Sequence, residues 1–144
     1  AGLPWKDFNT LDYLLVEYVG EANLGGLQLG QLKSLREFCR IPIILAHPNI
    51  ESPSRDVPFS VVCEILRRHT IALEIPGGSR NRWYWAKRDL SPLKNLFLTI
   101  GTDTHETLED VGKIDKSLAF LETHGLTGRL ADPDSLKSFS GGTP

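Results

Sequence analysis

The sequence predicts an α/β fold in which βα units build a parallel sheet. Four short apolar segments have the length and the β-branched or aromatic content of strands, and amphipathic helical patterns occur between them. Three of these strands are nearly continuous apolar stretches, which is typical of strands that are covered on both faces in a parallel sheet. Four βα units with right-handed crossovers would form half of a (βα)8-like barrel or a small open sheet. No internal repeat separates these two architectures.

The predicted strands are bounded by turn residues or by helical patterns. They span residues 11–19 (LDYLLVEYV), 41–47 (IPIILAH), 71–75 (IALEI) and 96–101 (LFLTIG). Residues 80–90 (RNRWYWAKRDL) fit no single pattern, and their three adjacent aromatic residues suit either the cover of a sheet or the wall of a cleft.

Two amphipathic helices are predicted between the strands, in residues 26–40 and 57–69, because apolar side chains recur there every three or four residues. The two stripes consist of Leu32, Leu35, Phe38 and Cys39, and of Pro58, Val62, Ile65, Leu66 and His69. His69 and His124 would each end a helix, where an imidazolium meets the negative end of the helix dipole, so we interpret both as structural.

The most clearly marked helix is predicted to begin at Thr107, which forms a capping box with Asp110, and to end at Gly125. Its apolar stripe would consist of Leu108, Val111, Ile114, Leu118 and Leu121. A short last helix is predicted with Asp132 as its cap and Pro133 as its first residue.

Length and composition indicate one ordinary globular domain, which we place at residues 1–140, followed by a tail at 141–144. A formal net charge of −2 gives no electrostatic reason to expect nucleic acid or an anionic membrane as a partner. Nucleic acid is therefore possible but not favoured. No apolar run reaches the roughly 18 residues of a membrane span, and the first ten residues do not resemble a signal peptide, so we expect a soluble, cytoplasmic protein. The chain contains no methionine and starts close to a strand, which suggests a fragment or a processed chain.

The two cysteines, Cys39 and Cys63, lie in helix-like segments and lack the spacing of a zinc ribbon or a disulfide framework. We therefore expect two buried free thiols.

Metal-binding side chains follow two of the predicted strands. Asp103 and His105 come directly after residues 96–101, and residues two apart in extended backbone point the same way. His47 ends the strand before Pro48. Because ligand sites in parallel α/β folds form at the C-terminal ends of strands, we predict that His47, Asp103 and His105 bind a divalent zinc, manganese or iron ion. Glu17 and Glu74 also lie near strand ends, but the sequence alone gives neither a ligand role.

A glycine-rich basic loop, PGGSRNR at residues 76–82, follows the third strand. Its paired glycines allow backbone N–H groups to approach an anion, and Arg80 or Arg82 can contact phosphate oxygens in a bidentate manner. The loop lacks the Gly-Lys-Ser/Thr ending of a P-loop. An ordinary basic surface loop is the competing interpretation.

The ordered set of AHP (46–48), LEI (73–75) and GTDTH (101–105) resembles the second half of a PHP domain, the polymerase and histidinol phosphatase superfamily. The last motif of that family commonly reads Gly-Ser-Asp-x-His. The resemblance covers most of residues 11–140 and implies a distorted (βα)7 TIM-like barrel that hydrolyses phosphoesters with two or three metal ions. By position, it implies that His47, Asp103 and His105 are metal ligands, while Glu74 matches a recurrent glutamate.

Two departures from the family stand out. Its opening His-x-His motif, the next histidine and the bridging glutamate would lie upstream of residue 1. In addition, Val19 occupies the end of the first strand, where family members often have histidine. The missing ligands would have to come from another chain or from an upstream half.

The leading hypothesis is therefore a phosphoesterase in which Asp103 and His105 serve catalysis and Arg80 or Arg82, in the basic loop, binds the substrate, a phosphorylated small molecule or a nucleotide. Two alternatives remain open. One is a non-catalytic half-barrel that pairs with a partner or with a second copy. The other is an amidohydrolase-like C–N hydrolase, which would have no need of the basic loop at residues 76–82.

Overall fold

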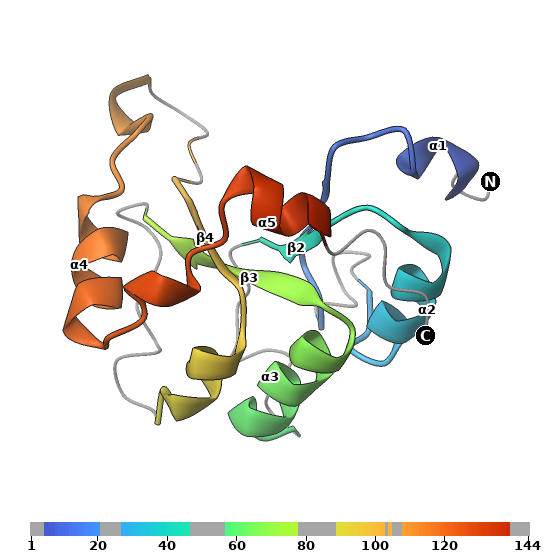
Figure 1. Cartoon of the computed structure of the whole chain (residues 1–144), viewed down its shortest axis with the longest axis horizontal. Coiled ribbons are helices and arrows are strands. Elements are labelled where there is room, and N and C mark those ends of the chain that lie inside the picture. Colours follow the sequence, from blue (N-terminus) through green and yellow to red (C-terminus); the bar gives the residue numbers. More distant parts are fainter. Residues whose placement is uncertain are drawn as a thin grey trace.

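A computed structural model of the chain describes residues 5–20, 27–46, 57–77, 89–102, 104 and 108–138. It confirms an α/β fold with a four-stranded parallel sheet in the order β1-β2-β3-β4 (Figure 1). The strands are β1 (Leu14–Val16), β2 (Ile43–Leu45), β3 (Ile71–Pro76) and β4 (Leu98–Gly101). Each strand therefore pairs with the strand that follows it along the chain.

Helices connect the strands and follow the last one. The α-helices are α1 (Trp5–Phe8), α2 (Gln31–Phe38), α3 (Phe59–Arg68), α4 (Asp115–Thr123) and α5 (Pro133–Ser138), and the 3-10 helices are η3 (Ser91–Asn95), η4 (Leu108–Asp110) and η5 (Thr127–Arg129). Within the described part of the chain, no helix combines the length and apolar character needed to cross a membrane.

The register of the strands divides the sheet into two faces. One face, which we call the core face, carries the paired residues Val16, Leu45, Leu73 and Leu98. All four belong to the hydrophobic core, together with Leu32 and Leu35 of α2, Val62, Cys63 and Leu66 of α3, Leu93 of η3, and Leu121 of α4. The helices α2, α3 and α4 thus bury their apolar stripes against the core face, as the arc of helices around the sheet in Figure 1 shows.

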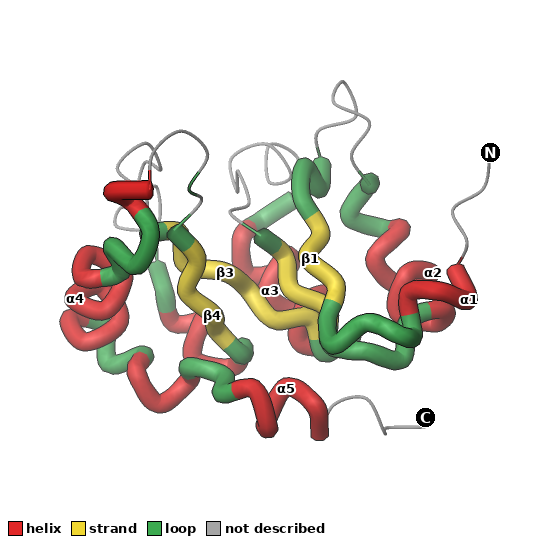
Figure 2. Tube along the Cα trace, turned by 90° about the horizontal axis from the view of Figure 1, so that it is seen from above, coloured by secondary structure: helices red, strands yellow, loops and turns green. Residues whose placement is uncertain are grey.

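The opposite face, which we call the second face, carries Ile44, Ala46, Ala72 and Glu74, because side chains alternate along a strand. Ile44, Ala46 and Ala72 are buried but lie outside the core cluster. Figure 2 shows α5 beside the N-terminal ends of the strands, which agrees with the bridge between Leu130 and Leu98, the first residue of β4.

The predicted helix at residues 107–124 is wrong in its first half. The chain forms η4 and then a turn in which Gly112 has φ +80°, and α4 begins only at Asp115. Leu108 and Val111 are 89% and 62% exposed, so they are not part of a buried stripe. A continuous helix requires a right-handed backbone at every residue. The left-handed Gly112 therefore prevents a helix from running through this position.

Smaller differences concern the first third of the chain. The predicted strand at residues 11–19 is reduced to β1, and α1 before it was not predicted. Phe38, assigned to the buried stripe of α2, is 56% exposed. Leu15 in β1 is 48% exposed, so this edge strand is not covered on both faces.

Several local predictions are confirmed. Cys39 and Cys63 are buried free thiols, and burial raises the pKa of the Cys63 thiol to about 12. His69 and His124 are the C-terminal cap residues of α3 and α4. Gly125, with φ +64°, closes α4 through hydrogen bonds from the Gly125 and Leu126 amides to the Glu122 and Leu121 carbonyls. Asp132 caps α5 by accepting a 2.6 Å hydrogen bond from the Ser135 amide.

Candidate functional site

The C-terminal ends of the four parallel strands lie along one edge of the sheet, at the top of Figure 2. The described residues that follow each strand there are Glu17 and Tyr18 after β1, Ala46 after β2, Gly77 after β3 and Thr102 after β4. Carbonyl groups and loop residues converge at this edge in parallel sheets, which is why binding sites of α/β folds occur there.

The residues that the sequence predicts for a site, His47, Arg80, Arg82, Asp103 and His105, all lie outside the described residues. Their described neighbours are informative nonetheless. Ala46 directly precedes His47 in the sequence, and its amide donates a 2.9 Å hydrogen bond to the Val16 carbonyl of β1. Gly101 and Thr102 precede Asp103 at the end of β4. The residues that directly precede His47 and Asp103 in the sequence therefore lie at strand ends.

The two threonines on either side of Asp103 contact each other. The Thr104 hydroxyl donates a 2.9 Å hydrogen bond to the Thr102 hydroxyl. The side chains of Thr102 and Thr104 thus point toward each other.

Glu74 is a feature of this edge for which sequence patterns alone indicate no ligand role. It lies in β3 on the second face and is 8% exposed. Its carboxylate fills the space above the Cα of Gly101, because a Cβ built on Gly101 would overlap the Glu74 Oε1 atom at 1.6 Å. Glu74 therefore reaches across from β3 to the first residue of the GTDTH motif. The signal in the sequence was a single carboxylate within the otherwise apolar strand IALEI.

The backbones of β3 and β4 are also held closely together beyond Glu74. The Gly77 amide donates a 2.7 Å hydrogen bond to the Gly101 carbonyl. A Cβ at Gly77 would lie 2.8 Å from the Lys113 carbonyl oxygen and 3.1 Å from the Ser117 hydroxyl, so only glycine fits between β4 and the start of α4. The glycine-rich loop of residues 76–82 thus begins at a packed position.

Within the part of the chain that the structure describes, no group of three or more His, Cys, Asp or Glu side chains could hold a metal ion. The predicted donors, two imidazoles and one carboxylate, have the ligand chemistry that zinc, manganese and iron accept. Glu74 adds a buried carboxylate at the same edge. The predicted donors and the carboxylate of Glu74 are thus residue types that suit a divalent transition metal.

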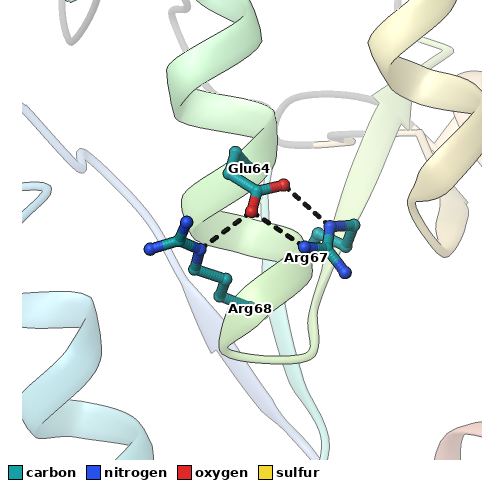
Figure 3. A network of polar contacts seen from close by, with 3 residues as sticks. All are labelled: Glu64, Arg67 and Arg68. Carbon is teal, nitrogen blue, oxygen red and sulfur yellow. Dashed lines mark hydrogen bonds and ion pairs between the residues drawn. The ribbon is translucent and has the colours of Figure 1, made fainter.

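A pocket of about 340 Å³ lies elsewhere, between α3 and η3 on the outer helical layer. Its lining residues are Ser60, Cys63, Glu64, Arg67, Ser91, Pro92 and Asn95. The charges in it compensate each other, because Glu64 accepts hydrogen bonds of 2.8 Å from both Arg67 and Arg68 (Figure 3). We therefore assign this pocket no role and place the candidate site at the strand ends.

Comparisons of the chain with protein-family models, with curated proteins and with solved structures give no match. The sequence motifs and the geometry of the strand ends are thus the basis of the functional inference.

Proposed function

We propose that the chain is part of a metal-dependent phosphoesterase of the PHP type. The observation that carries the proposal is the buried carboxylate of Glu74, which lies against Gly101 at the C-terminal edge of the sheet. Burial of an ionised carboxylate is costly unless it is paired or hydrogen-bonded, and buried ionisable groups occur often at functional sites. Here it adjoins the GTDTH segment that carries two of the three predicted ligands.

The architecture supports the same proposal. A parallel sheet whose strands follow one another in chain order, with the core helices on one face, is what a segment of a (βα) barrel looks like. The second face would then be the barrel interior. Four strands correspond to about half of the distorted (βα)7 barrel that the resemblance implies.

In the proposed mechanism, His47, Asp103 and His105 would hold a divalent metal ion, whose chemistry there would be to lower the pKa of a bound water at neutral pH. Asp103 would orient the attacking water, so that its oxygen bonds to phosphorus in line while the ester P–O bond breaks and the alcohol leaves with a proton from solvent. Arg80 and Arg82 bind the phosphoryl oxygens and neutralise the charge that develops on them. The substrate class is a phosphorylated small molecule or a nucleotide.

The first test combines elemental analysis with hydrolysis of p-nitrophenyl phosphate in the presence of Mn²⁺ or Zn²⁺. We expect His105→Ala to lose bound metal and to lower kcat/KM by about 100-fold or more. His124→Ala, which changes the exposed cap residue of α4, is the matched control and should retain both. Unchanged metal content and activity in His105→Ala would refute the proposed site.

A further variant tests Glu74 through its neighbour. Gly101→Ala places a methyl group where the Glu74 carboxylate lies, and the flexible carboxylate end must move away while the strand backbone stays. If Glu74 serves the site, Gly101→Ala and Glu74→Gln should reduce metal affinity to a similar extent. The variant with both substitutions should then show little further loss of metal affinity, because each substitution alone removes the same carboxylate from the same place.

A second candidate function, a non-catalytic half-barrel that pairs with another chain, is favoured by a different observation. Leu11, Tyr13 and Leu15, at every second position along the edge strand β1 and the residues before it, are 48%, 52% and 48% exposed. The backbone N–H and C=O groups of an edge strand are a template for pairing with another strand, and exposed apolar side chains favour such an association. The molecular mass in solution, measured as a function of concentration, tests this candidate.

A further inference from the structure

We draw no further inference here: the strongest candidate, the pocket of about 340 Å³ between α3 and η3, carries nothing, because Glu64 and Arg67 in its wall pair with each other and every buried side-chain nitrogen or oxygen of the described residues has a hydrogen-bond partner.

Discussion

Glu64 on α3 has a carboxyl group whose pKa is strongly shifted by two neighbouring arginines. Hydrogen bonds from Arg67 and Arg68 lower its pKa from the usual 4.5 to about 2 (Figure 3). The carboxylate bridges the last turn of the helix, where positive side chains also interact favourably with the dipole. The pair of arginines therefore stabilises the ionised form of Glu64.

A folded-state pKa below the unfolded value contributes stability at pH values above about 4.5. That contribution is lost as the pH falls from about 4.5 to about 2, because the carboxylate then becomes protonated in the folded state too. Glu64→Gln should therefore lower the urea midpoint at pH 7, and the difference from the wild type should vanish near pH 2. Glu37→Gln is the control, because its ion pair with Lys33 is exposed and 3.9 Å long. If Glu64→Gln lowered the urea midpoint by the same amount at pH 7 and near pH 2, the ionised Glu64 carboxylate would not be the source of the stability.

At the scale of the elements, Arg36 joins two helix ends to the start of two strands. Its guanidinium donates hydrogen bonds of 2.9 to 3.3 Å to the carbonyls of Cys39, Ile41, His69 and Thr70. These carbonyls end α2 and α3 and precede β2 and β3, so one side chain supplies donors that the helix ends lack. Partial burial lowers the pKa of Arg36, although the group stays protonated at any ordinary pH.

Arg36→Met should destabilise the fold by about 2–3 kcal/mol, because it leaves several carbonyls without a donor. Arg36→Lys should restore only a small part of the lost free energy of unfolding. A single ammonium group cannot reach all four carbonyls in the two segments that precede β2 and β3. Urea unfolding measures both changes. Lys33→Met on the exposed side of the same helix is the control and should change the free energy of unfolding by less than about 0.5 kcal/mol. Full recovery by lysine would mean that charge alone accounts for the role of Arg36.

At the scale of the whole molecule, the sheet has two unlike faces and an apolar edge. The core face is packed by helices, whereas β1 leaves Tyr13 and Leu15 about half exposed. A parallel sheet in soluble proteins is normally covered on both faces. We therefore expect the isolated chain to associate through β1 as its concentration rises.

Leu15→Lys should abolish this association, because a lysine on an edge strand opposes pairing with another strand. Val61→Lys is the control, since Val61 is 43% exposed on α3, outside the β1 edge. Analytical ultracentrifugation of the three chains gives the comparison. A wild-type chain that remains monomeric at all concentrations would argue against β1 as a self-association edge.

The elements that could be predicted from the sequence are those determined by local chemistry. The parallel strands, α2 and α3, the caps at Gly125 and Asp132 and the free thiols follow from periodicity, turn residues and spacing. The helix predicted from Thr107 failed because its apolar residues had the right spacing while Gly112 ended the segment with a left-handed backbone. Apolar spacing alone does not show whether a neighbouring element is available to bury the residues, and Leu108 and Val111 have none that covers them.

Short-range patterns in the sequence are sufficient to predict the α/β class, the order of the elements and the residue types that follow the strands. The folded structure is needed to show that Glu74 lies against Gly101, that Arg36 contacts both helix-to-strand connections, and that Tyr18 is exposed while Val19 enters the core. The contacts of Glu74 with Gly101 and of Arg36 with the α3–β3 connection join residues that are 27 to 34 positions apart in the sequence, and the exposure of Tyr18 depends on the left-handed backbone of one residue. Neither kind of feature leaves a periodic signal in the sequence. Contacts between distant strands and helices are set by packing, which the local sequence does not contain.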